Sequence, residues 1–198
     1  MEKENKFHLV KGWLFSKFVK ITQMKLIEKP SPAEYPAYAQ AYINLLPNDD
    51  LIMQHLEDNL QATIALVQSL SADKLLHRYA PDKWTIKEVL VHNIDDERIY
   101  AYRAMCFARG EQQELPGFEQ EDYARNSGAN ERDIANIMDE YQAVRRATIS
   151  LFNGFTDTDL MKTGLANKNR ATVRGLLYHL AGHELHHINL IKTRYLTD

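Results

Sequence analysis

The stretch Gly182-His183-Glu184-Leu185-His186-His187, near the C-terminal end of the sequence, sets two histidines four residues apart. On an α-helix, positions four apart differ by about 40° in direction and by about 6 Å in height. Both rings can therefore turn toward one ion, and this is the spacing of helical metal ligands. The stretch indicates a metal-binding helix at the end of the chain.

His179 extends the same series, so the helix offers two candidate pairs. Positions eight apart lie about 12 Å apart along the axis, and one ion with ligands at about 2.1 Å cannot reach all three rings. The centre of the apolar stripe lies about 20° from His187 and about 60° from His183. It lies about 100° from His179 and about 120° from His186, so the periodicity favours the pair His183 and His187. The stripe consists of Val173, Leu176, Leu177, Leu180 and Ile191.

The alternative to a metal site is ordinary packing. Histidines four apart also occur by chance in a His-rich helix, and a lone histidine on an apolar face is more often a satisfied core residue. A metal site further requires at least one ligand from another part of the chain.

Composition narrows the class of protein. The 198 residues suffice for one domain with a sizeable core, and nothing requires two. A net charge of −3, without a basic run that contains aromatic residues, disfavours nucleic-acid binding. No apolar run approaches the roughly 20 residues of a transmembrane helix. The single cysteine, Cys106, excludes an intrachain disulfide and fits a reducing, cytoplasmic location.

The first 23 residues differ from the rest because they carry a net charge of +3. The segment 13–20 is basic and amphipathic but lacks the features of a signal peptide. It predicts a membrane-surface helix, a disordered extension, or translation begun upstream of a true start at Met24. The prolines at positions 30, 32 and 36 predict an extended lead-in. We therefore divide the chain into an extension with its lead-in, residues 1–47, and a main domain, residues 48–198.

Four helices are expected in the main domain. The first runs from about Asn48, a candidate cap, to about residue 70. The second starts at the capping box 85–88 and ends near Gly110. The third runs from about residue 130 to Gly154, and the fourth begins near Thr172. Similar sequences at 85–92 and 172–179 suggest two related helical hairpins. The pattern predicts an all-α four-helix bundle, in which metal sites form between facing helices.

Two motifs carry a resemblance to a known family. The segment Tyr79-Ala80-Pro81-Asp82-Lys83-Trp84-Thr85-Ile86-Lys87-Glu88-Val89-Leu90-Val91-His92, continued by residues 95–98, resembles the second-helix signature of the DinB-like (YfiT-like) superfamily. Residues 182–188 resemble its fourth-helix signature. The resemblance covers roughly residues 45–196 and implies one divalent metal bound by His92, His183 and His187. Periodicity does not orient His92, because its helix is apolar nearly all round.

Three imidazoles leave an open coordination position, which suits a catalytic metal. The resemblance implies a metal-dependent transferase, since members of known activity use bacillithiol, mycothiol or glutathione, and some are thiol-dependent isomerases or amide hydrolases. We expect a thiol S-transferase that acts on small electrophiles in detoxification or stress response. The alternatives are a metal-dependent hydrolase and a non-catalytic bundle with a structural or sensing role.

The expected cofactor is zinc or nickel, although three imidazoles also accept iron, cobalt or manganese. A low-molecular-weight thiol is the expected co-substrate, and a small molecule and a second copy of the chain are the expected partners. Glu184 and Glu97 are candidates to orient a ligand or transfer a proton. Their alternative is a structural ion pair with an arginine. Asp95 and Asp96 are further candidates to support a ligand. The candidate arginines are Arg98, Arg145 and Arg146.

Overall fold

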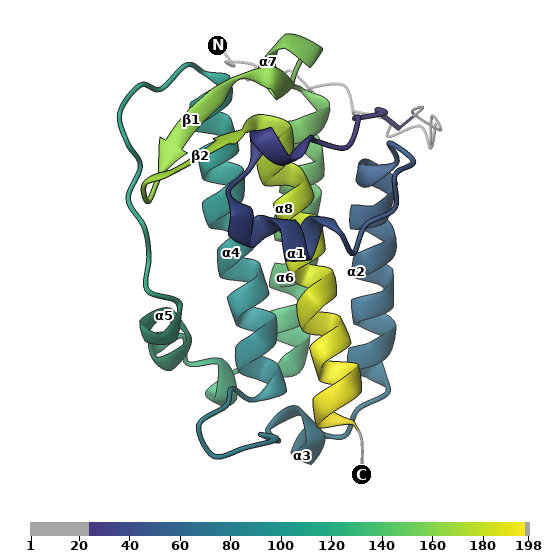
Figure 1. The fold of residues 1–198 in the computed structure, drawn as a ribbon. Coiled ribbons are helices and arrows are strands. Elements are labelled where there is room, and N and C mark those ends of the chain that lie inside the picture. The colour runs from purple at the N-terminus through teal and green to yellow at the C-terminus, as the bar shows by residue number, and fades with distance from the viewer. Residues whose placement is uncertain (1–23, 197–198) are drawn as a thin grey trace, which may run out of the picture.

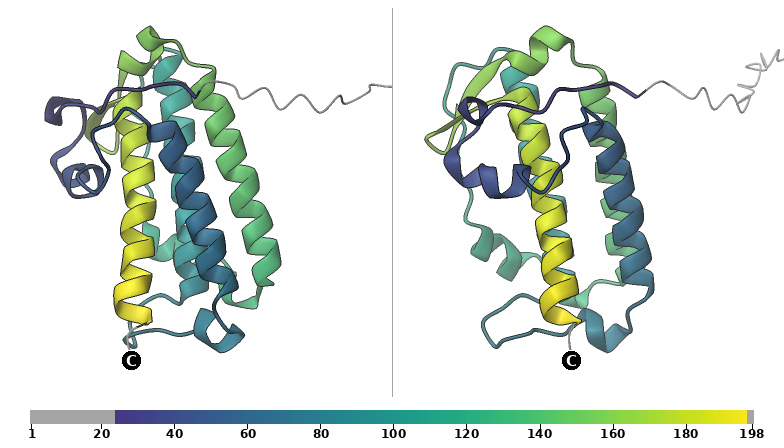
Figure 2. Two further views of the ribbon diagram at one scale, coloured as in Figure 1. Left: turned by 90° about the vertical axis from the view of Figure 1, so that its right-hand side faces the viewer. Right: turned by 45° about the vertical axis from the view of Figure 1, so that its right-hand side comes forward.

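Four long helices run side by side in the computed structural model, which describes residues 24–196 (Figures 1 and 2). This arrangement confirms the predicted all-α four-helix bundle. The long helices are α2 (Ile52–Gln68), α4 (Ile86–Ala108), α6 (Ile134–Asn153) and α8 (Val173–Leu190), which continues as a π-helical turn, Ile191–Tyr195. The shorter elements are α1 (Gln40–Ile43), α3 (Ala72–Leu75), α5 (Gln120–Asn126), α7 (Asp157–Met161), β1 (Thr163–Ala166) and β2 (Asn169–Thr172).

Side-chain caps begin the helices that carry the histidines. Thr85 accepts a hydrogen bond from the Glu88 backbone, and the Glu88 side chain accepts one from the Thr85 backbone, which confirms the capping box at the start of α4. Thr172 caps α8 by accepting the Gly175 N–H. The predicted cap at Asn48 is wrong, because the chain makes a left-handed turn at Asp50 (φ 61°) and α2 begins only at Ile52.

Apolar side chains fill the bundle along its whole length. α4 packs against both α6 and α8, and both α4 and α8 have buried residues on several sides. Removing each such side chain from water stabilises the fold by about 1.5–3 kcal/mol relative to an exposed position. Fully buried members include Ile43, Ile52, Leu56, Phe152 and Leu177 toward one end and Ile86, Leu90, Ile137 and Ile191 toward the other.

Residues 24–47, which we name the strap, cross the outer side of α8 (Figure 1). The expected extended lead-in instead forms two 3₁₀ turns, Pro32–Glu34 and Ala37–Ala39, followed by α1. The Tyr178 hydroxyl donates to the Ile27 carbonyl at 2.7 Å, and Arg174 pairs with Glu34. A Cβ at position 182 would lie 2.4 Å from the Tyr42 carbonyl oxygen, so α8 needs glycine where the strap crosses it.

The predictions for residues 1–23 fall outside the described residues. The boundary between residues 47 and 48 stays a prediction, although the strap contributes Ile27 and Ile43 to the core. Among residues 24–196, no helix is long and apolar enough to cross a membrane.

A small hairpin precedes α8. Strands β1 and β2 are antiparallel, with Thr163 opposite Thr172, and the turn between them places Asn167 and Lys168 at positive φ. Two such residues give the turn geometry that matches the twist of a two-stranded hairpin. The hairpin delivers the chain to the Thr172 cap and so sets where α8 begins.

Candidate metal centre

Three histidines from two helices converge where α4 faces α8. The Nε2 atom of His183 lies 3.3 Å from Nε2 of His92 and 3.1 Å from Nε2 of His187. One ring nitrogen from each histidine lies within 4.8 Å of the other two. The residues are 3%, 6% and 9% exposed in chain order. The structure thus brings together the three histidines named from the sequence, and their role as ligands stays a prediction.

The nitrogen spacing fits one metal ion. Tetrahedral coordination with bonds of about 2.1 Å places ligand nitrogens about 3.4 Å apart. Neutral imidazole carries only one N–H, so mutual hydrogen bonds cannot satisfy all the facing nitrogens. The buried Nδ1 of His187 also has no hydrogen-bond partner among the described residues. A divalent ion would use the lone pairs that this arrangement gathers.

Burial keeps these rings uncharged. Desolvation lowers the pKa of His92 to about 4 and, with His92 and His186 nearby, lowers the pKa of His187 to about 3. The pKa of His183 falls well below its ordinary value, first through burial and then through the neighbouring imidazoles. Metal ligation requires neutral imidazole, and at neutral pH no proton has to leave these rings.

Asp96 supports the central histidine. It lies one turn after His92 on α4, and its Oδ2 lies 3.3 Å from Nδ1 of His183. Burial raises the pKa of Asp96 to about 8. In its ionised form, which a bound cation would favour, this carboxylate would accept the Nδ1 proton and so favour the tautomer whose Nε2 lone pair faces the other histidines. Asp95, the other carboxylate expected to support a ligand, differs from Asp96 in its surroundings. It is only half-buried and pairs with Arg98.

A cavity of about 260 Å³ opens beside His183 and His187. The indole of Trp84 forms part of its wall, with its ring centre 4.6 Å from that of His92. The indole N–H donates to Glu121 at 3.0 Å, which fixes the orientation of the ring. The remaining lining mixes aromatic and aliphatic side chains with polar and charged ones, so the cavity suits a small molecule that has both apolar and polar parts. It comprises Tyr42, Tyr79, Asp82, Lys83, Val89, Gln120, His186, Leu190 and Tyr195.

The two other histidines of α8 stay outside this cluster. His186 is exposed and packs its ring against Tyr42. His179 is buried, although the periodicity placed it well away from the apolar stripe, because the strap covers that side of α8. Its ring stacks on Tyr100, with centres 4.1 Å apart.

Glu97 and Glu184 converge on Arg145, which is almost fully buried. The Nη2 atom of Arg145 lies 2.9 Å from Glu97 and 2.7 Å from Glu184. Tyr141 donates to Glu184 at 2.7 Å, and Arg145 also donates to the Leu56 carbonyl. These contacts match the alternative in which Glu97 and Glu184 form a structural ion pair with an arginine. The carboxyl group that contacts a candidate ligand is Asp96.

The long helices and three facing imidazoles define a helical bundle with the donors of a metal centre. The chain belongs to the DinB superfamily, whose family model matches residues 55–191. This confirms the resemblance noted from the two motifs.

A solved structure of YfiT from Bacillus subtilis, described as "a probable metal-dependent hydrolase with an unusual four-helix bundle topology", is similar to this chain. The two structures superpose with a TM-score of 0.67 and 18% sequence identity, and the match covers 73% of this chain and 84% of YfiT. At this identity the match shows a shared fold. No curated protein matches the chain.

Trp84 is the contributor to the site that sequence reasoning missed. It belongs to the quoted second-helix motif, but it lies just before α4 begins, where helical periodicity gives no direction. Its place directly before the Thr85 cap was the available signal, because a cap fixes the path of the residue that precedes it.

Proposed function

We propose that this protein is a metal-dependent enzyme that holds one divalent ion on His92, His183 and His187 and activates a thiol for transfer to a small electrophile. The observation that carries the proposal is the convergence of three buried, neutral imidazoles, with Nε2 atoms 3.1 and 3.3 Å apart, beside a cavity of about 260 Å³. Three ligands leave room for a fourth, exchangeable one, as catalytic sites require.

A bound ion would supply Lewis acidity, which lowers the pKa of a thiol or water in the open position. Side chains of the protein orient the ligands and receive the substrate. Asp96 holds His183 in the required tautomer, and Trp84 packs against His92 and restricts the ring from turning away. The aromatic side chains of the cavity wall would receive the apolar part of the electrophile. Zinc or nickel suits three imidazoles, and iron, cobalt or manganese would also be accepted.

The thiol is inferred from the family resemblance, and a second candidate uses the same centre differently. YfiT is described as a probable metal-dependent hydrolase, which favours water as the activated group. Both candidates need the same histidines and the same open position, so only an activity measurement with and without thiol separates them.

The test uses purified protein stripped with chelator and reloaded with zinc or nickel. A fluorogenic electrophile such as monochlorobimane is offered with bacillithiol, mycothiol, glutathione or cysteine, and chromogenic esters and amides are offered without thiol. We expect metal-dependent, thiol-dependent adduct formation that chelator abolishes. The matched control is His186→Ala, which changes an exposed histidine of the same helix and should retain the metal.

Each possible result assigns a different function to the metal centre. Thiol-independent hydrolysis would replace the transferase with the hydrolase. Stoichiometric metal without either reaction would favour a structural or sensing bundle. Failure of the stripped protein to bind any of the five metals would overturn the proposal as a whole.

A further inference from the structure

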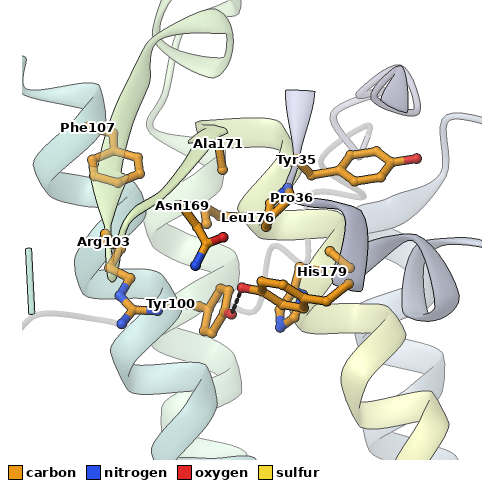
Figure 3. Close-up of a pocket in the computed structure, with 13 residues that line it drawn as sticks. Tyr35, Pro36, Tyr100, Arg103, Phe107, Asn169, Ala171, Leu176 and His179 are labelled. Carbon is orange, nitrogen blue, oxygen red and sulfur yellow. Dashed lines mark hydrogen bonds between the residues drawn. The ribbon is translucent and has the colours of Figure 1, made fainter. Parts of the chain in front are cut away.

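A second cavity lies between α4, α8, the strap and the β-hairpin (Figure 3). His179 and Tyr100 separate it from the metal centre, since the His179 ring stacks on Tyr100 and next to His183, with centres 4.1 and 5.7 Å apart. The lining combines apolar residues with a few polar groups: Tyr35, Pro36, Tyr38, Ala39, Tyr100, Arg103, Phe107, Ala166, Asn169, Ala171, Gly175, Leu176 and His179.

Arg103 gives this cavity its charge. It is 6% exposed, its Nη2 donates to the Pro116 carbonyl at 3.0 Å, and its guanidinium lies over the Tyr100 ring at 5.2 Å. Among residues 24–196, no carboxylate oxygen lies within 4.0 Å of Arg103, whereas Arg145, which is more deeply buried, has two carboxylates. A guanidinium has five donors, and a buried charge without a counter-ion is costly. Arg103 therefore has no directly paired carboxylate, and the acid that interacts with its charge at longer range is Asp96.

Neutral polar groups complete the lining. The hydroxyls of Tyr38 and Tyr100 lie 3.1 Å apart, and only one proton is used between them, so the other can point to a ligand. Asn169 reaches toward Arg103 and Tyr100 from the hairpin (Figure 3). The buried Nδ1 of His179 has no hydrogen-bond partner among the described residues. One cation with hydroxyl and amide donors around it is the chemistry that receives an anion.

We propose that this cavity binds the carboxylate group of a small organic acid, with Arg103 as its counter-ion. The cavity measures about 20 Å³, and about 10–15 Å³ on this measure admits one water molecule. A flat carboxylate fits this space better than a tetrahedral phosphate or sulfate. The rest of the acid extends past Tyr38, which is 51% exposed at the edge of the cavity. The inference does not depend on the metal centre.

Acetate is the probe for the test. Thermal unfolding of the chelator-stripped protein is followed against sodium acetate, with sodium chloride and sodium sulfate at equal ionic strength as references. We expect a saturable rise of the midpoint with acetate and a smaller, non-saturating change with the other salts, because a ligand that binds only the folded state stabilises it. The same titration of the His187→Ala variant should give the same rise, which separates this cavity from the metal centre.

Arg103→Gln should weaken acetate binding at least 10-fold, and Arg103→Lys should weaken it less because the charge remains. Arg109→Gln, which changes an exposed arginine at the C-cap of the same helix, is the control and should bind normally. Should Arg103→Gln fail to fold, Tyr38→Phe at the exposed edge provides the second variant, with an expected weakening of several-fold. Acetate no more effective than chloride or sulfate, or an undiminished response in Arg103→Gln and Tyr38→Phe, would overturn the proposal.

Discussion

Each histidine of the candidate metal centre owes its neutral state to burial. A free imidazole would be partly protonated near neutrality, but desolvation lowers the pKa of His92 to about 4 and that of His187 to about 3. Folding alone therefore keeps these imidazoles in the neutral form that metal ligation requires. We therefore expect the loss of any one of the three imidazoles to release the ion.

Replacing His187 with alanine removes one of the three facing nitrogens. We expect metal affinity to fall by more than about 100-fold, beyond the 10–100-fold that follows loss of a supporting residue, and any metal-dependent turnover to disappear with it. Metal content after dialysis and activity under the same conditions measure both effects. His186→Ala should leave the metal content unchanged, since its exposed ring lies outside the three-histidine cluster, and should lower activity only if His186 contacts the substrate in the cavity that it lines. Full occupancy and activity in His187→Ala would show that the three-histidine assignment is wrong.

The buried cluster of Arg145, Glu97 and Glu184 places two carboxylates around one guanidinium. Arg145→Met would leave both acids without a counter-ion, and we expect it to cost about 3–5 kcal/mol of unfolding free energy. Glu184→Gln leaves the pair of Arg145 and Glu97 in place and should cost clearly less. Denaturant unfolding of both variants measures the order.

The opposite order would mean that Glu184, rather than Arg145, organises the cluster. A second readout tests the chemical role first considered for Glu184. If the carboxylate is structural, folded Glu184→Gln should retain metal and activity. A fall in activity of about 10-fold or more with the fold intact would instead assign it a part in proton transfer or ligand support.

At the scale of the elements, the strap and α8 meet at a point where only glycine fits. Alanine usually favours a helix over glycine by about 1 kcal/mol. In Gly182→Ala the new Cβ would lie 2.4 Å from the Tyr42 carbonyl oxygen, so the clash should reverse the sign and lower the melting temperature. Gly154→Ala, whose Cβ would meet a carbonyl oxygen at 3.3 Å, is the control. A stabilised Gly182→Ala protein would show that the strap does not press on α8.

The long helices could be predicted because their signals are local. The capping box at Thr85 and the stop at Gly154 act within one turn, and both appear where expected. The strap could not be predicted, because its structure depends on contacts with α8, which lies about 140 residues later in the chain. The start of α2 was misplaced for a related reason, since the left-handed turn at Asp50 overrides the capping tendency of Asn48.

The two histidines of α8 could be chosen from the sequence because helical periodicity fixes their direction relative to the apolar stripe. The direction of the His92 side chain could not be derived in this way, because α4 is buried on several sides. Its assignment as a candidate ligand depended on the family motif. Trp84 and Arg103 were missed because their partners, Glu121 of α5 and the carbonyl of Pro116, come from the segment that follows α4. Pairings of this kind become visible only once the bundle is assembled.

For the whole molecule, the buried imidazoles make the metal-free protein sensitive to acid. Their pKa values in the folded state, about 4 for His92 and about 3 for His179 and His187, lie below the ordinary value of 6.5. The unfolded chain therefore takes up protons first, and stability should decline as pH falls from about 6.5 toward 4. Asp96, with its pKa raised to about 8, acts in the opposite direction, as do Asp95 and Glu184, whose pKa values burial also raises. We expect the histidines to outweigh these carboxyls over this range of pH. Melting temperatures across this range measure the decline.

A double variant, His92→Asn with His187→Asn, provides the control for this decline. It removes two of the groups that titrate on unfolding, so its melting temperature should depend less steeply on pH than that of the parent chain. Added zinc should also raise the melting temperature of the parent near neutrality and not that of the variant, because only an ion that binds the folded state stabilises it. Equal pH profiles for the two proteins would contradict the assignment of the acid sensitivity to these rings.

The crossing of α8 by the strap has a consequence for how the protein is made. During translation the strap leaves the ribosome well before α8, yet each buries part of the other. Ile27 and Ile43 must therefore stay without their final partners until nearly the whole domain has been synthesised, and a paused or truncated chain exposes them to aggregation. His183 and His187 also emerge after His92, so an ion held on all three histidines would mark a chain that has been synthesised through α8.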